Sequence, residues 1–225
     1  AVTKDMADTE YKKANYQQAI KDYEELLKYG VSPELYYNLG NSYYRINNIT
    51  RALINYERAS MLDPGNKDIR FNLQFVRNKT IDKYADDNEM FFVTWYKTIV
   101  NIASVDGWAK ISVISVIFAL LLLLVYLFCE NVNLRKVGFF GSLAFIGCFI
   151  FSLLYAYQQK YYFENRCGAI AISPVVNVKK TPSVGNTDEF IIHEGTKVYI
   201  TDRGMEGWIG VRLSDGREGW ILKDQ

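Results

Sequence analysis

Two long stretches without a charged residue constrain the fold of this chain more than any other feature. They run from Ile111 to Cys129, ISVISVIFALLLLLVYLFC, and from Val137 to Tyr157, VGFFGSLAFIGCFIFSLLYAY. As helices rising ~1.5 Å per residue, both are long enough to cross a hydrocarbon core of ~30 Å. The alternative is a pair of buried helices in a soluble protein, but such helices normally keep a polar stripe. The sequence therefore predicts two transmembrane helices.

The connection between the two stretches, Glu130 to Lys136, is short and predicts an antiparallel helical hairpin. Both flanking segments would then lie on the same side of the membrane. Small residues recur every fourth position on the second helix, and we expect this stripe to face the first helix. The stripe consists of Ala144, Cys148, Ser152 and Ala156.

The orientation of the hairpin depends on few charges. Arg135 and Lys136 in the loop favour a cytoplasmic loop, but basic residues also flank the other side, so the positive-inside rule alone is nearly undecided. A small residue at position 1, Ala1, is what a cleaved signal peptide would leave, and such a peptide would place both soluble parts outside the cytoplasm. Cys129 and Cys167 would lie at opposite faces of the bilayer, so we predict no intramolecular disulfide, with Cys167 either free or intermolecular.

Before the first span, apolar residues fall at helical spacing at Phe92, Trp95, Ile99 and Ile102, followed by the breaker pair Asp106-Gly107. This pattern predicts an amphipathic helix lying in the membrane interface. Packing of this helix against the N-terminal domain is the alternative.

The N-terminal part of the chain contains a helical repeat. The stretch from Pro33 to Asn66 places Gly40 and Ala52 where two helices touch, fills the space around them with aromatic residues, and closes the second helix at Pro64. It resembles a tetratricopeptide repeat over its whole length. A weaker copy lies one repeat length upstream, and FNL at 71–73 repeats YNL at 37–39 as the start of a capping helix.

Repeats of this family present a concave surface formed by their first helices, and partners usually bind there. The resemblance implies a groove whose mix of aromatic, amide and guanidinium groups suits a peptide or extended segment; solvated consensus residues are the alternative for Asn41 and Tyr44. The implied groove residues are Asp8, Tyr11, Tyr37, Asn41, Tyr44, Arg45, Phe71 and Phe75.

Beyond Gly168 the pattern changes to short alternating runs separated by turn residues, which predicts a small all-β barrel. The runs are AIAI, VVNVKK, FIIH, KVYIT, WIGVRL and GWIL, with turns predicted at 194–195, 203–204 and 215–216. Residues 168–225 resemble the bacterial SH3 domain, whose eukaryotic relatives bind extended ligands with surface aromatic side chains. Tyr199 and Trp208 are the candidate surface residues, and we expect Trp220 to lie in the core.

Catalytic and metal-binding patterns are missing from the sequence. The single histidine, His193, has no paired nucleophile or second histidine, so we expect a solvated or hydrogen-bonded strand residue. We predict no enzyme, no metal and no cofactor. Residues 1–89 carry 13 Lys and Arg against 14 Asp and Glu, and residues 168–225 carry 7 against 8, so neither end offers the basic patch that nucleic-acid binding needs.

The order of segments predicts a multidomain chain: an all-α tetratricopeptide-repeat solenoid, a two-helix transmembrane hairpin and a C-terminal SH3-like barrel. The predicted segments are 1–83 (repeats with capping helix), 84–107 (linker and interfacial helix), 108–129 (first span), 130–136 (loop), 137–157 (second span), 158–167 (linker) and 168–225 (SH3-like domain).

This order of segments resembles the BatE-type proteins of the bacterial Bat aerotolerance operon. The resemblance implies an inner-membrane protein with periplasmic domains, which works beside membrane proteins carrying von Willebrand factor A domains. We expect a scaffold that binds protein partners at the cell envelope. A protein that senses or binds peptidoglycan is the alternative.

Overall fold

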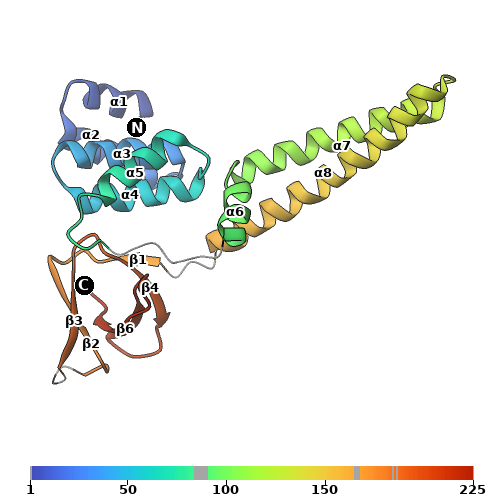
Figure 1. Ribbon diagram of the computed structural model, residues 1–225. Helices are drawn as coiled ribbons and strands as arrows, with labels where there is room; N and C mark the ends of the chain where they lie inside the picture. Colours follow the sequence, from blue (N-terminus) through green and yellow to red (C-terminus); the bar gives the residue numbers. More distant parts are fainter. Residues whose placement is uncertain (1, 84–90, 165–167, 184, 186, 225) are drawn as a thin grey trace. The chain divides into compact units, whose positions relative to one another are not determined.

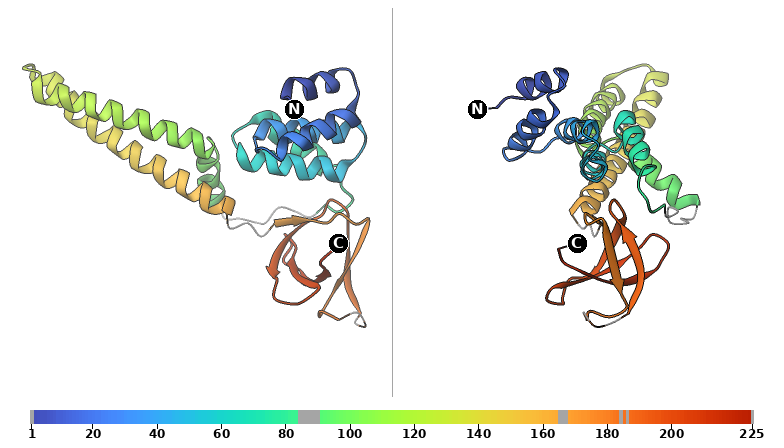
Figure 2. Two further views of the ribbon diagram at one scale, coloured as in Figure 1. Left: turned by 180° about the vertical axis from the view of Figure 1, so that it is seen from behind. Right: turned by 90° about the vertical axis from the view of Figure 1, so that its left-hand side faces the viewer.

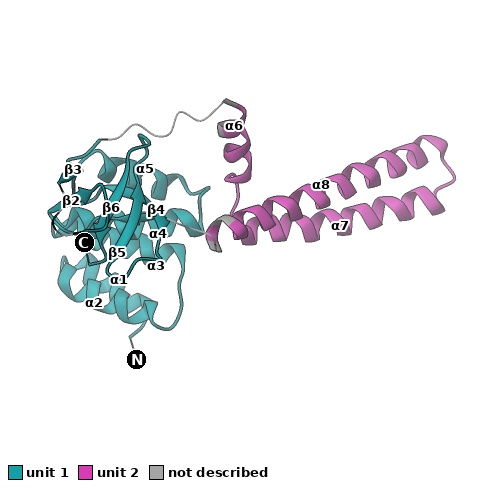
Figure 3. Cartoon of the chain, turned by 90° about the horizontal axis from the view of Figure 1, so that it is seen from below, with its two compact units in different colours: residues 1–90, 166–225 teal, residues 91–165 magenta. Residues whose placement is uncertain are grey.

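The computed structural model describes residues 2–83, 91–164, 168–183, 185 and 187–224. The chain forms two compact units, one made of residues 1–90 together with 166–225 and the other of residues 91–165 (Figure 3). The two ends of the chain thus belong to the same unit, and the apolar middle forms the other. Cys167 lies outside the described residues.

The first unit begins with a stack of antiparallel helices (Figures 1 and 2). Two of them start at residues that the sequence marks as helix caps. The Ser32 hydroxyl accepts a 3.1 Å hydrogen bond from the Leu35 amide, and Asn66 accepts from the Asp68 amide at 3.1 Å. The helices are α1 (Lys4–Lys12), α2 (Tyr16–Leu27), α3 (Pro33–Arg45), α4 (Ile49–Leu62) and α5 (Lys67–Arg77).

The predicted repeat offset recurs in the backbone and in the core. Ala14 and Asn47, which occupy equivalent positions in successive repeats, both have φ of 61° in the turn between the two helices of a repeat. Gly40 is so close to the Tyr56 ring that a Cβ added to it would lie 2.8 Å from a ring carbon. The fully buried residues Ala7, Ala19, Tyr23, Ala52, Tyr56 and Ala59 form the seams between these helices.

Helix α5 packs on α4 and closes the stack, as the sequence predicted. Its Leu73 and Val76 join the repeat core, whereas Phe71 and Phe75 on the opposite face stay 70% and 44% exposed. Neither phenylalanine belongs to the buried core of the stack.

The C-terminal part of the first unit is a six-stranded antiparallel sheet whose strands follow the order β1-β4-β5-β6-β2-β3. The strands are β1 (Gly168–Ile170), β2 (Val175–Lys179), β3 (Asp188–His193), β4 (Lys197–Asp202), β5 (Trp208–Arg212) and β6 (Glu218–Leu222). They coincide with the six predicted runs and enclose a core formed by Ala171, Val176, Val178, Ile192, Val198, Val211, Leu213 and Ile221.

Glycines with positive φ occupy the turns of this sheet, where an L side chain would be strained. The predicted turns at Gly195 and Gly216 have φ of 84° and 88°. Between β4 and β5 the positive φ falls at Gly207, not at the predicted Gly204. The assignment of Trp220 to the core was wrong: it is half-buried and alternates with the buried Gly219 and Ile221.

Two carboxylates from the helical part hold the turn between β3 and β4. Asp82 accepts hydrogen bonds of 2.6 Å from the His193 amide and from the Thr196 hydroxyl, and its other oxygen lies 3.0 Å from Nδ1 of His193. Glu57 of α4 forms ion pairs with Arg77 and, at 3.1 Å, with Lys197 of β4. The histidine is therefore a hydrogen-bonded strand residue, one of the two alternatives that the sequence left open.

The second unit consists of α6 (Phe91–Val100), α7 (Val105–Phe128) and α8 (Val132–Glu164), with α7 and α8 side by side as an antiparallel hairpin (Figures 1 and 2). Residues 105–128 and 132–161 have the length and apolarity of membrane spans, with mean hydropathies of 3.0 and 2.2. In the most apolar 18-residue window of each span, only 17% of the residues are buried within the chain. Most of the apolar surface of the hairpin is thus left for another environment to cover.

The hairpin begins earlier than predicted. Ser104 caps α7 by accepting a 3.2 Å hydrogen bond from the Gly107 amide. Asp106 lies in the first turn, where its negative charge interacts favourably with the positive end of the helix dipole. Asp106-Gly107 therefore belongs to the start of α7 and does not separate α6 from it. The break lies at residues 101–104.

The predicted small-residue stripe does not form the interface between the two long helices. Ala144 and Cys148 are exposed, although Ser152 is buried. The closest approach is at Gly138, where an added Cβ would lie 2.7 Å from the Leu122 carbonyl oxygen. The buried residues that face the partner helix are Ser112, Ser115 and Ala119 on α7, and Gly138, Ser142 and Ser152 on α8.

Hydrogen bonds join α6 to the end of the hairpin at which α7 begins and α8 ends. The Gln159 amide donates 2.8 Å hydrogen bonds to the carbonyl oxygens of Val100 and Ala103, and the Trp108 indole donates to the same Val100 oxygen at 2.8 Å. Tyr155 packs against Trp108 with ring centroids 5.0 Å apart. These bonds satisfy carbonyl groups that the end of α6 leaves without an intrahelical partner.

Candidate functional site

The eight predicted groove residues lie on α1, α3 and α5, and the side chains of these three helices touch one another. Asn38 of α3 donates a 3.2 Å hydrogen bond to Asp8 of α1, and Asn72 of α5 donates a 3.1 Å bond to Asn41 of α3. The first helices of the repeats and the capping helix are therefore direct neighbours on one surface.

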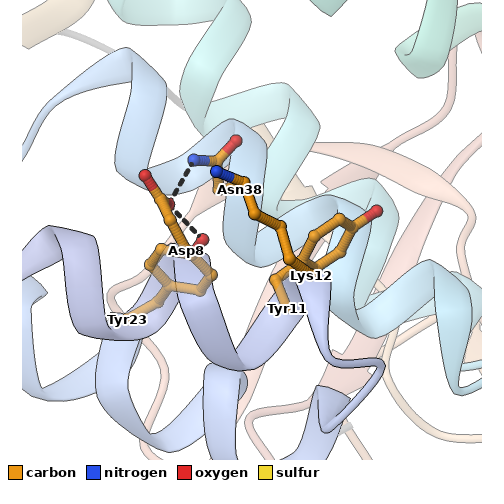
Figure 4. Close-up of a pocket in the computed structure, with 5 residues that line it drawn as sticks. All are labelled: Asp8, Tyr11, Lys12, Tyr23 and Asn38. Atoms are coloured by element: carbon orange, nitrogen blue, oxygen red, sulfur yellow. Dashed lines mark hydrogen bonds between the residues drawn. The ribbon is translucent and has the colours of Figure 1, made fainter.

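The surface is built around a hydrogen-bonding pattern that occurs twice. Tyr23 donates a 2.5 Å hydrogen bond to Oδ1 of Asp8, the same atom that receives the Asn38 bond (Figure 4). These residues, with Tyr11 and Lys12, line a hollow of about 220 Å³ (Figure 4). In this pattern, a buried tyrosine on the second helix of a repeat donates a hydrogen bond to a polar side chain on the first helix.

The second copy lies one repeat further along the chain. Tyr56 donates a 2.6 Å bond to Oδ1 of Asn41, which also accepts from Asn72. The Asn72 amide also donates to the Tyr37 hydroxyl at 3.1 Å. Asn41 is therefore positioned by hydrogen bonds and is not simply a solvated consensus residue.

The remaining predicted residues form a strip of aromatic rings beside this pattern. The Tyr44 and Phe75 rings meet edge to face with centroids 5.8 Å apart, and Phe75 stacks on Phe71 at 6.4 Å. Tyr11 accepts a 3.4 Å hydrogen bond from Nε of Arg45. The strip and the hydrogen-bonding pattern thus lie on the same three helices.

Charge within the surface is balanced at its α1 end. Lys4 forms 2.8 Å ion pairs with Asp8 and with Glu34. Partial burial raises the pKa of Asp8, but hydrogen bonds from Lys4 and Tyr23 outweigh it and hold that pKa below its usual value. Burial, followed by the hydrogen bond to Asp8, raises the pKa of Tyr23 far above that of a free tyrosine, so the phenol remains a donor.

Sequence reasoning missed several residues of this surface: Lys12, Tyr23, Asn38, Asn72 and Lys79, whose ammonium donates a 3.0 Å hydrogen bond to the Tyr44 hydroxyl. The repeat offset could have found some of them, because Tyr23 and Tyr56 occupy equivalent positions of successive repeats, and so do Asn38 and Asn72.

The two candidate residues of the sheet lie on its outer face. Tyr199 pairs with Arg212 across β4 and β5, while the neighbouring Val198 and Val211 point into the core. Trp208 and Arg212 share one face of β5 because side chains alternate along a strand. Trp220 of β6 pairs with Gly210 and lies on this face as well.

Within the parts of the chain that the structure describes, no three His, Cys, Asp or Glu side chains come together as metal ligands.

A comparison with known families supports the helical assignment. The family model of the tetratricopeptide repeat matches residues 33–66, which span α3 and α4. No curated protein matches the chain. The chain is a tetratricopeptide-repeat-containing protein with two long apolar helices and a C-terminal antiparallel sheet, and a repeat of this kind indicates interaction with other proteins.

Proposed function

We propose that this chain is a membrane-anchored scaffold that binds a protein partner through the surface of α1, α3 and α5. The observation that carries the proposal is the exposed Phe71–Phe75 pair, which continues into hydrogen-bonded polar groups of the repeat. Large exposed apolar side chains rimmed by fixed polar groups are typical of protein-binding surfaces.

The α7–α8 hairpin would act as the anchor. Its spans are apolar and little buried. Three of its buried serines donate hydrogen bonds to carbonyl oxygens of their own helix: Ser112 to Ala109, Ser142 to Phe139 and Ser152 to Cys148. A lipid bilayer would cover the remaining apolar surface. The resemblance to Bat aerotolerance proteins supports a bacterial inner-membrane setting with periplasmic domains, and the outer face of the sheet, with Tyr199 and Trp208, would hold a second partner there. We propose no catalytic role.

Anchoring is tested by extracting cell membranes with alkaline carbonate and then with detergent. An anchored protein stays with the lipid in carbonate and is released by detergent. Recovery in the carbonate supernatant would refute the anchor. Protease accessibility in spheroplasts tests the sidedness: a periplasmic arrangement exposes both ends of the chain to added protease.

Partner binding is tested by cross-linking in intact membranes followed by purification of the chain. We expect Phe71→Ala and Tyr37→Ala to lose a cross-linked partner that the unmodified protein retains. Tyr29→Ala is the matched control, because Tyr29 is 83% exposed and lies beyond the end of α2. Retention of every partner by the Phe71 and Tyr37 variants would refute the assignment of the surface.

A further inference from the structure

Helix α6 is held at the depth where the two spans end (Figure 1). The Trp108 indole donates to the Val100 carbonyl oxygen of α6, and the Tyr96 hydroxyl of α6 donates a 3.0 Å hydrogen bond to the Gln158 side chain. Trp108 lies just before the charge-free stretch of α7, and Gln158 directly follows that of α8. If the spans cross a bilayer, α6 therefore lies at the level of its headgroups.

The exposed apolar side chains of α6 share one face of this helix. Phe92 and Trp95 are 61% and 60% exposed, and the partly buried Ile99 falls on the same face by helical spacing. Val100, which is 5% exposed, lies about a quarter of a turn away from Phe92. One side of α6 is thus buried, while the neighbouring side presents two large aromatic rings that remain exposed in the described part of the chain.

Helix α8 carries exposed aromatic residues at the same depth. Tyr157 and Tyr161 are 70% and 56% exposed, and their rings stack with centroids 6.5 Å apart. Tyr155 and Gln159, on either side of Tyr157 in the sequence, both contact α6 or its C-terminal end. Tyr157 therefore points about half a turn away from the side of α8 that contacts α6. The four exposed rings, called here the aromatic collar, are Phe92, Trp95, Tyr157 and Tyr161.

Backbone groups beside the aromatic collar are satisfied within the chain. The Val100 and Ala103 carbonyl oxygens accept 2.8 Å hydrogen bonds from the Gln159 amide, and Val100 also accepts from the Trp108 indole at 2.8 Å. The hydrocarbon region of a bilayer supplies no hydrogen-bond donors, so backbone groups close to it need partners from the protein. These side-chain bonds therefore favour a lipid environment over an aqueous one at this end of α6.

We propose that the aromatic collar binds the headgroup boundary of a lipid bilayer and gives the chain a second membrane-binding element beside its two spans. This inference rests on the proposed function, because it needs the hairpin to cross a bilayer. The collar continues the apolar surface of the spans, and Trp and Tyr concentrate at membrane interfaces because their rings suit lipid and their polar groups suit water. The apolar spacing of residues 92–102 predicted an interfacial helix; the structure adds its depth and the tyrosine pair on α8.

The proposal is tested with the full chain reconstituted into phosphatidylcholine vesicles. Part of the lipid carries bromine on its acyl chains, which quenches the fluorescence of a tryptophan that touches it. The contribution of Trp95 is the difference between the unmodified chain and Trp95→Phe. We expect bromine close to the headgroup to quench Trp95 more strongly than bromine at the chain ends, and we expect Trp95 to be shielded from acrylamide dissolved in the water.

A charged substitution then tests the face of α6. Phe92→Glu should move Trp95 toward water, so that quenching by brominated lipid falls and quenching by acrylamide rises. Asn101→Glu is the matched control, because Asn101 is exposed, directly follows α6 and lies about half a turn away from Phe92. Equal resistance of both variants to unfolding by sodium dodecyl sulfate in mixed micelles would show that the hairpin is intact in each.

Three results would overturn the proposal: brominated lipid leaves Trp95 unquenched, Phe92→Glu behaves as Asn101→Glu does, or Trp95 is shielded from both quenchers. The last result would mean that a protein surface, and not lipid, covers this face of α6. Failure of the collar can be told apart from failure of the anchor. A chain that stays with the membrane in alkaline carbonate while Trp95 escapes lipid quenching would keep the anchor and remove the collar, whereas release by carbonate would remove both.

Discussion

Tyr56 donates a 2.6 Å hydrogen bond to the Oδ1 atom of Asn41, and the ring that carries this hydroxyl also packs against Gly40. One buried side chain therefore sets both the spacing of α3 and α4 and the orientation of a groove amide. The stability of the repeat and the geometry of the proposed binding surface are linked through this residue.

Removing the Tyr56 hydroxyl should weaken the hydrogen bonding that orients Asn41 in the groove, while the ring continues to fill the core. Tyr56→Phe keeps the ring but takes the tyrosine donor away from Asn41, which should lower the free energy of unfolding by about 1 kcal/mol. Chemical denaturation of the detergent-solubilised chain measures this. Tyr29→Phe is the control, because Tyr29 is exposed and its hydroxyl bond to Glu25 is long at 3.3 Å. Equal losses for both variants would contradict the role assigned to Tyr56.

Adding one methyl group at Gly40 should destabilise the repeat. A Cβ there would lie 2.8 Å from the Tyr56 ring, and overpacking of this kind costs about 1–3 kcal/mol. Gly30→Ala is the matched control, because an added Cβ at Gly30 meets nothing within 4 Å. Thermal unfolding of the two variants side by side checks the prediction, and a neutral Gly40→Ala would show that α3 and α4 pack less closely.

A matched pair of glycine-to-alanine substitutions also tests the packing of the two long helices, α7 and α8. Gly138→Ala would bring a Cβ within 2.7 Å of the Leu122 carbonyl oxygen, and backbone cannot move aside as a flexible side chain can. We expect α7 and α8 to separate locally, with a loss of about 1–3 kcal/mol in resistance to unfolding by sodium dodecyl sulfate in mixed micelles. Gly147→Ala should be neutral, since nothing lies within 4 Å of the added Cβ. A larger loss at Gly147 than at Gly138 would contradict the observed hairpin interface.

Acid should weaken the contact between Asp82 and the sheet. Burial raises the pKa of Asp82, but the hydrogen bonds from Thr196 and His193 prevail and lower it below its usual value of 3.8. Because the pKa is lower in the folded state, the carboxylate stabilises the fold above pH 3.8 and this contribution disappears as the pH falls through the folded-state pKa. Asp82→Asn should therefore be less stable than the unmodified protein at neutral pH, with the difference shrinking below pH 3.8.

That comparison is made by denaturant unfolding at a series of pH values. Asp5→Asn serves as the control, because Asp5 lies exposed in the first turn of α1, away from the sheet contacts described. A stability difference for Asp82→Asn that does not change with pH would show that its carboxylate charge is not what holds the turn.

Local patterns in the sequence were enough to predict most of the fold. The small residues Gly40 and Ala52 predicted a close helix pair, and period-two alternation predicted all six strands. The start of α7 was misplaced because Asp106-Gly107 was interpreted as a break, when Ser104 caps a helix that includes both residues. Trp220 was assigned to the core, although in β6 it alternates with the buried Gly219 and Ile221.

Contacts between segments that lie far apart in the sequence could not be predicted from local sequence patterns. Glu57 and Lys197 lie far apart in the sequence, and each is an ordinary charged residue in its own segment. The interface of α7 and α8 was also mispredicted. Small residues recur every fourth position on two faces of α8, one with Gly138 and Ser142 and the other with Ala144 and Cys148. Sequence spacing alone does not indicate which of these two faces packs against α7. For the groove, the repeat offset placed the first-helix residues, but the choice of hydrogen-bond partners depended on neighbouring helices.

The ion pair between Glu57 and Lys197 has a consequence for biosynthesis. A ribosome completes α4 long before it reaches β4, and both long apolar helices must leave the exit tunnel in between. Until then the nascent helical stack carries Glu57 and Asp82 without their partners from the sheet. A message truncated after α8 would therefore release a product whose repeats are fully translated but whose Glu57 and Asp82 lack their partners from the sheet.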